Sequence, residues 1–136
     1  MITTIIIPGP PIPLQRPRLG HGRVYDAQKK EKENVINTIL TKTDFPPNHD
    51  EVTLEINFFM KMPKGIGKKK QEKLQDKPHT SRPDIDNLIK FYLDVCNGFL
   101  YDDDSQIYNI KATKTYCKEA RTEITIKYGE SNGIQK

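Results

Sequence analysis

Several carboxylates and one lysine in the second half of the chain have the types and spacing that metal-assisted hydrolysis requires. Asp84 and Asp86 are separated by one residue, and Lys90 follows four residues after Asp86. Asp103 and Asp104 close a run of three aspartates further along the chain. Two carboxylates about 4 Å apart repel each other by roughly 4 kcal/mol at an effective dielectric constant near 20. A converging set therefore needs a raised pKa or a bound cation, and Mg²⁺ prefers such oxygen ligands.

A magnesium ion held by these carboxylates could assist the hydrolysis of a phosphodiester. A bound divalent metal lowers the pKa of water and stabilises a leaving oxygen. Lys90, on the same edge, could orient the nucleophile or stabilise the developing negative charge. Taken singly, each residue has an ordinary alternative: an aspartate at a helix start caps the helix, and a lysine on a helix is usually solvated. The order and spacing of the set favour the chemical interpretation.

Charge is distributed unevenly along the chain. The 136 residues include 22 lysines and arginines against 18 aspartates and glutamates, for a net charge of +4. Residues 82–104 contain two basic and six acidic residues, whereas residues 61–77 contain seven lysines. A basic protein with one concentrated acidic spot suits a polyanionic partner and a separate bound cation. The lysine-rich segment, with Lys68, Lys69 and Lys70, has the alternative of being only a solvated surface.

Other features of the sequence exclude several classes of protein. No apolar run approaches the roughly 20 residues of a membrane helix, and no secretory signal is evident. Two cysteines, Cys96 and Cys117, are too few for a disulfide framework, so we expect them to be buried and the protein to be cytoplasmic. The three histidines lie in loops rich in proline or glycine and are expected to be exposed: His21, His49 and His79.

Hydrophobic periodicity predicts the elements that must position the acidic residues. Alternating residues predict strands over 3–7, 51–61, 106–116 and 121–128, with the last two joined as a hairpin through 117–120. A period near 3.6 predicts helices over 26–42 and from about 84 to 97, and a short charged helix over 68–75. The proline-rich segment 8–24 is predicted to be an extended loop.

This order of elements predicts one small α+β domain, with two main helices packed on a mixed sheet. We expect the domain to span residues 1–129 and residues 130–136 to form a flexible tail. An antiparallel return of the final strand could bring its start beside the end of the first strand.

One segment resembles the RusA family of Holliday junction resolvases. The resemblance is carried by Arg82-Pro83-Asp84-Ile85-Asp86-Asn87-Leu88 with Lys90, then Asn97-Gly98 and Asp103-Asp104-Ser105-Gln106-Ile107. Arg16-Pro17-Arg18, in the proline-rich loop, is also similar to members of that family. The likeness covers most of residues 2–128, and residues 82–107 are its specific part. Members of the family are small, dimeric, Mg²⁺-dependent endonucleases that are often encoded by prophages.

The resemblance implies roles for individual residues. The metal-binding aspartates of the family fall on Asp84 and Asp86, and its catalytic lysine falls on Lys90. The third aspartate falls on Asp104, with Asp103 as a neighbouring candidate metal ligand. Backbone phosphates of DNA would be contacted by Arg16, Arg18, Arg82, Lys68, Lys69 and Lys70.

The resemblance also implies a RusA-like fold, a homodimer and a partner, branched DNA. The expected activity is paired symmetric hydrolysis at a four-way junction, in DNA recombination and repair, with Mg²⁺ or alternatively Mn²⁺. The alternative is a non-catalytic nucleic-acid-binding protein whose acidic cluster is structural. In that case, loss of Asp84 would improve DNA binding without removing any activity.

Overall fold

The computed structural model describes the chain except for residues 1, 16–17, 21–22, 26, 43–48 and 130–136, and at 18–20 and 23–25 it describes the backbone alone. The predicted tail, 130–136, and Arg16 therefore lie outside the described residues. None of the helices within the described part of the chain is long and apolar enough to cross a bilayer.

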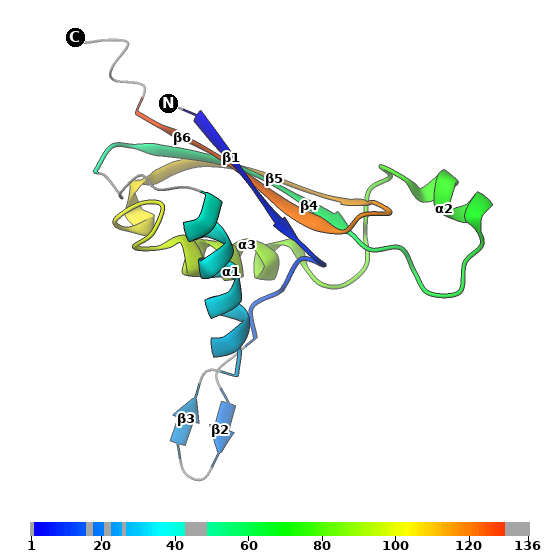
Figure 1. Ribbon diagram of the computed structural model, residues 1–136, viewed down its shortest axis with the longest axis horizontal. Coiled ribbons are helices and arrows are strands. Elements are labelled where there is room, and N and C mark those ends of the chain that lie inside the picture. The colour runs from blue at the N-terminus through cyan, green and yellow to red at the C-terminus, as the bar shows by residue number, and fades with distance from the viewer. Residues whose placement is uncertain (1, 16–17, 21–22, 26, 43–48, 130–136) are drawn as a thin grey trace.

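A mixed sheet of four strands forms the centre of the fold, in the order β1-β6-β4-β5 (Figure 1). The strands are β1 (Ile2–Pro8), β4 (Val52–Met60), β5 (Ile107–Tyr116) and β6 (Arg121–Tyr128). Helices α1 (Lys29–Lys42) and α3 (Ile85–Cys96) cover one face of this sheet (Figure 1). The predicted α+β class, with two main helices on a mixed sheet, is confirmed.

The strand β4 lies between β5 and β6, so the predicted hairpin of the last two strands is wrong. β4 pairs with β5 in parallel and with β6 in antiparallel orientation. Neighbouring strands lie about 4.8 Å apart, and four extended residues can span about 13 Å. The connection 117–120 can therefore cross the end of β4, where the Cys117 amide donates to the Met60 carbonyl at 2.8 Å.

The start of β6 lies beside the end of β1, where Pro8 pairs with Arg121, as the suggested antiparallel return requires. The segment 8–24 is not a loop throughout: β2 (Arg18–Gly20) and β3 (Arg23–Tyr25), which ends one residue beyond the segment, pair as a small second sheet. The prediction of an extended loop missed this pairing.

The core lies between the two helices, α1 and α3, and the sheet. Leu88, Phe91 and Tyr92 on α3 are buried, as are the inward residues of β4 such as Phe58, whose ring centroid lies 5.7 Å from that of Tyr92. Each such side chain contributes about 1.5–3 kcal/mol when buried. The two cysteines, Cys96 and Cys117, are buried as expected. This packing fixes α3 firmly against the sheet.

The proline-rich segment is tied to α3 by hydrogen bonds. The Ile12 amide and the Thr122 hydroxyl both donate to the buried Tyr92 hydroxyl, at 3.0 and 3.2 Å. The Leu14 amide donates to the Asn87 carbonyl at 2.9 Å. The segment therefore holds a defined position beside the start of α3.

Candidate active site at the start of helix α3

The two leading aspartates flank the first residue of α3. Asp84 precedes the helix with an extended backbone, and its side chain makes no capping hydrogen bond. Asp86 lies in the first turn, and the carboxylates of both residues are exposed. The ordinary role of an aspartate at a helix start, capping, therefore does not account for Asp84. Both carboxylates are available to a ligand in solvent.

Lys90 lies beside Asp86 on the surface of α3, as the spacing of four residues predicts. Its Nζ is 3.9 Å from Asp86 Oδ2, and the two side chains are 61% and 66% exposed. Exposed ion pairs of this kind contribute about 0.2–1 kcal/mol. The lysine can therefore leave Asp86 at small cost and contact a substrate phosphate.

Lys114, on β5, holds the loop that leads into α3. Its Nζ donates to the carbonyls of Ser81 and Pro83, at 2.6 and 2.7 Å. Lys114 pairs with the buried Phe58 of β4, so its side chain leaves the sheet on the face that α3 covers. Sequence reasoning missed this residue. The signal that could have found Lys114 is a charged residue at a position where alternation along the strand predicts an inward side chain.

His79 forms part of the same loop and corrects one prediction. Its side chain is not exposed but partly buried, with its ring centroid 4.7 Å from that of Tyr116. The Nδ1 atom is buried and has no hydrogen-bond partner among the described residues. Burial, and then the charge of Lys114, lower the pKa of His79. The ring is therefore neutral near pH 7. His49 is exposed as predicted, and His21 lies outside the described residues.

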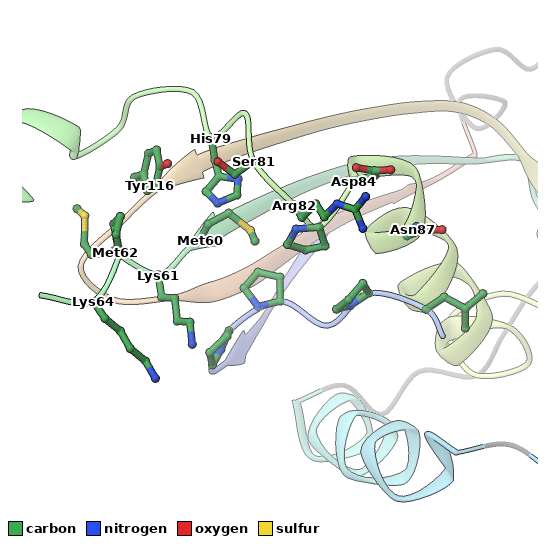
Figure 2. A pocket seen from close by; sticks show the side chains of 16 residues that line it. Met60, Lys61, Met62, Lys64, His79, Ser81, Arg82, Asp84, Asn87 and Tyr116 are labelled. Carbon is green, nitrogen blue, oxygen red and sulfur yellow. The ribbon is translucent and has the colours of Figure 1, made fainter. Parts of the chain in front are cut away.

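Asp84 lies between two cavities. The first, of about 780 Å³, is bounded by the proline-rich segment, the end of β4 and the loop 79–84 (Figure 2). The second, of about 1000 Å³, lies between residues 78–86 and the part of β5 from Ala112 to Thr115, and Asp86 also lines it. Arg82 lines both cavities. The exposed carboxylates thus border space that a substrate could enter from either side.

Asp104 lies at the opposite end of α3. It begins the short 3-10 helix η1 (Asp104–Gln106), and its pKa is raised by burial, and further by the charges of Asp103 and Asp94. Asp94, whose charge acts on Asp104, lies near the end of α3. Asp94 is eight residues after Asp86, which is about 12 Å along a helix axis, so Asp104 lies far from Asp86. Within the described part of the chain, no group of three His, Cys, Asp or Glu residues is arranged to hold a metal ion. One chain therefore brings together Asp84, Asp86 and Lys90, but not Asp104.

The neighbours of Asp104 have local roles. Asp103 caps η1: its carboxylate accepts from the Ser105 amide at 3.1 Å, and its own amide donates to Gln106 Oε1 at 2.9 Å. Hydrogen bonds from the Ser105 side chain and amide lower the pKa of Asp103. Asp102 Oδ2 lies 2.6 Å from His49 Nδ1. Asp103 is therefore a weaker candidate for a metal ligand than Asp104.

The candidate DNA-contacting residues lie in different parts of the molecule. Arg82 is exposed directly beside Asp84. Lys68, Lys69 and Lys70 are exposed on α2 (Lys68–Leu74), a helix with no buried residues that stands beyond one end of the sheet (Figure 1). Arg18 lies in β2, where only the backbone is described. The contacts of these residues with DNA stay predictions.

Sequence comparison supplies the relationship that the site suggests. A family model of the endodeoxyribonuclease RusA matches residues 8–127. The chain belongs to the RusA family. The part that matches RusA contains Asp84, Asp86, Lys90 and Asp104, and thus the whole candidate site.

A curated relative adds a more distant likeness. The uncharacterized protein YqaN of Bacillus subtilis (strain 168) is 37% identical over 81 residues. The match covers 56% of this chain and 56% of YqaN, so it spans little more than half the length of that relative.

Proposed function

We propose that this protein is a Mg²⁺-dependent endodeoxyribonuclease that resolves four-way DNA junctions by paired symmetric hydrolysis, in recombination and repair. The observation that carries this proposal is the start of α3. There, Asp84 and Asp86 are exposed, and the Asp84 side chain makes no capping hydrogen bond. Arg82 lies beside Asp84 in the chain, and Lys90 lies beside Asp86. The residues fall within the match to the RusA family.

The carboxylates at the start of α3 fit a magnesium ion. Mg²⁺ is usually held by one or two carboxylates, together with water and substrate phosphates. Asp84 and Asp86 supply two hard oxygen donors that are open to solvent. When bound, such an ion would lower the pKa of water and stabilise the leaving oxygen. Mn²⁺ has similar oxygen-ligand preferences and is expected to substitute.

The chain's own basic residues would position the substrate around these carboxylates. Arg82, exposed beside Asp84, would hold a backbone phosphate with its planar guanidinium group. Lys90 would move from Asp86 to the phosphate and stabilise the charge that develops during hydrolysis. The lysines of α2 would contact phosphates further along the DNA arm, without reading its sequence.

We further propose that the protein acts as a homodimer and that the second copy supplies Asp104 to the site. In one chain, Asp104 lies at the far end of α3 from Asp84 and Asp86. A partner copy could bring its own Asp104 to them. A two-fold dimer with two sites also matches the two-fold symmetry of paired cuts.

The strand β5 offers a surface for this contact. It is an edge strand, and Tyr108 and Ile110 on it are 61% and 38% exposed. The far end of β5 bonds to residues 76–79 through Lys114 and Tyr116, so by alternation Ile110 and Ala112 direct their backbone groups to the open edge. Two copies paired here around a two-fold axis would run antiparallel. The start of one β5, preceded by Asp104, would then approach the end of the other, near Asp84 and Asp86.

Replacing one carboxylate separates cleavage from binding and tests the proposed function. We expect Asp84→Asn to abolish cleavage of a labelled four-way junction in Mg²⁺ while the dissociation constant for the junction stays within about threefold, because Asp84 contributes to metal binding rather than to phosphate contacts. Cleavage near the wild-type rate would contradict the assignment of Asp84. Absence of any wild-type cleavage, with tighter DNA binding by Asp84→Asn, would favour the non-catalytic binding protein instead.

A further inference from the structure

A cavity beside Asp84 extends well beyond the residues to which the proposed hydrolysis assigns a role. It lies between the proline-rich segment, the end of β4 and the loop 79–84, and its volume is about 780 Å³ (Figure 2). This lies within the range of about 300–1,000 Å³ that is usual for small-molecule sites. The cavity is therefore large enough to hold a ring system with its attached sugar.

The lining of the cavity is mainly apolar and partly aromatic. Met60, Met62 and Tyr116 line it together with prolines 10, 11 and 13, and the ring of His79 packs on Tyr116 at 4.7 Å between centroids. The imidazole is uncharged near pH 7, because burial and Lys114 lower its pKa. Such a surface favours a flat, uncharged ring rather than a phosphate.

Charged residues lie at the margins of this apolar lining. Figure 2 shows Lys61 and Lys64 at one side of the cavity and Arg82 with Asp84 at the other. Lys61, Lys64 and Arg82 are all exposed. A ligand with one apolar ring and a phosphate on either side of it matches this distribution of charge. A nucleoside within a DNA strand has this form.

The walls of the cavity are held in place before any ligand binds. The Leu14 amide donates to the Asn87 carbonyl, which joins the proline-rich wall to α3. The His79 amide donates to the Lys114 carbonyl and the Tyr116 amide donates to the Lys77 carbonyl, at 2.9 and 3.0 Å. The wall that holds His79 and Tyr116 is therefore fixed by backbone hydrogen bonds that need no ligand.

We propose that this cavity receives one unstacked nucleoside of the DNA junction, next to the phosphate that lies at Asp84. This inference rests on the proposed function. Extruding a base is easiest where stacking is already interrupted, as at a branch point. Arg82 would hold the phosphate on one side of the nucleoside, and Lys61 and Lys64 would hold the phosphate on the other. The cavity would thus favour branched DNA over a continuous duplex.

A photocrosslink can locate the nucleoside. A four-way junction with 5-iodouracil at the crossover would be bound to the wild-type protein in EDTA and irradiated, and the crosslinked peptides would be identified by mass spectrometry. We expect crosslinks at Tyr116 or His79. A matched pair of variants completes the test: Met62→Trp fills the cavity, whereas Ile6→Trp adds the same ring to a residue that is 43% exposed on β1. Met62→Trp should lower the yield at Tyr116 and His79 at least tenfold at saturating protein, and Ile6→Trp should leave it unchanged.

Two outcomes would overturn the inference. One is a junction that is bound and, in Mg²⁺, cleaved, but that crosslinks only to residues outside the cavity. The other is a crosslink at Tyr116 that Met62→Trp does not reduce. In both cases the nuclease function would stand, because cleavage is read separately. A wild-type protein that neither binds nor cleaves the junction would instead overturn the proposed function, and this inference with it.

Discussion

Lys90 is placed beside the proposed metal site by one local contact. Its Nζ lies 3.9 Å from Asp86 Oδ2, and both side chains are largely exposed. The weak exposed pair keeps the ammonium group near the proposed metal site without trapping it there. Its contribution is therefore expected in the cleavage step rather than in binding.

Lys90→Ala should lower the single-turnover rate of junction cleavage by about 100-fold, a loss typical of removing one group that stabilises developing charge. The dissociation constant for the junction should change by less than about threefold. Lys30→Ala, on the exposed surface of α1, is the matched control and should leave both values unchanged. If Lys90→Ala weakened binding while the saturated rate stayed at the wild-type value, Lys90 would be a phosphate anchor only.

Sequence reasoning succeeded at this scale where spacing along one helix determines proximity. The separation of four residues between Asp86 and Lys90 places them on one face of any helix, and the structure confirms this contact. Asp104 could not be placed in the same way. Its distance from Asp84 depends on how the chain turns after α3, which local spacing does not determine. The partly buried ring of His79 likewise depends on its packing against Tyr116, a residue on a distant strand.

At the scale of elements, β5 holds the loop that leads into the start of α3. Lys114 on this strand holds the carbonyls of Ser81 and Pro83 and thereby the approach of the chain to Asp84. Alternation along β5 is predictable from the sequence, but it does not reveal that a lysine at an inward position holds two carbonyls of a distant loop. The hairpin of β5 and β6 was wrong because a short connection between two strands does not reveal that a third strand, β4, lies between them.

Lys114→Met should loosen the loop before α3. The partly buried Pro83 carbonyl loses its donor, which costs about 1–3 kcal/mol, whereas the exposed Ser81 carbonyl can bond to water instead. We expect a lower free energy of unfolding in urea and faster amide exchange over residues 80–84. Lys111→Met lies on the same strand but is exposed, so it should leave stability and exchange near wild type. Equal behaviour of the two variants would show that Lys114 does not support the loop.

At the scale of the whole molecule, the position of Asp104 connects the active site to assembly. The proposed dimer provides each site with Asp84 and Asp86 from one chain and Asp104 from the other. No feature of a single sequence shows which surface a second copy covers. The strand order of the folded sheet places β5, with the exposed Tyr108 and Ile110, at the edge.

Mixing two inactive variants tests this arrangement. Asp84→Asn and Asp104→Asn should each be inactive alone. In a mixed dimer, one site would carry both substitutions and the other would be intact. Random association makes half of the dimers mixed, so co-refolded protein should regain roughly a quarter of the wild-type sites and produce single nicks. If all three carboxylates came from the same chain, the mixture would remain inactive.

The most direct measurement of the central claim is a nicking assay on a labelled synthetic four-way junction, beside a linear duplex of the same sequence. With Mg²⁺, the account predicts paired symmetric nicks in the junction, little cleavage of the duplex, and none of either substrate in EDTA. Tight, salt-sensitive binding of the junction without any cleavage in Mg²⁺ or Mn²⁺ would contradict the account. The acidic residues at the start of α3 would then be structural, and the protein would be a DNA-binding module.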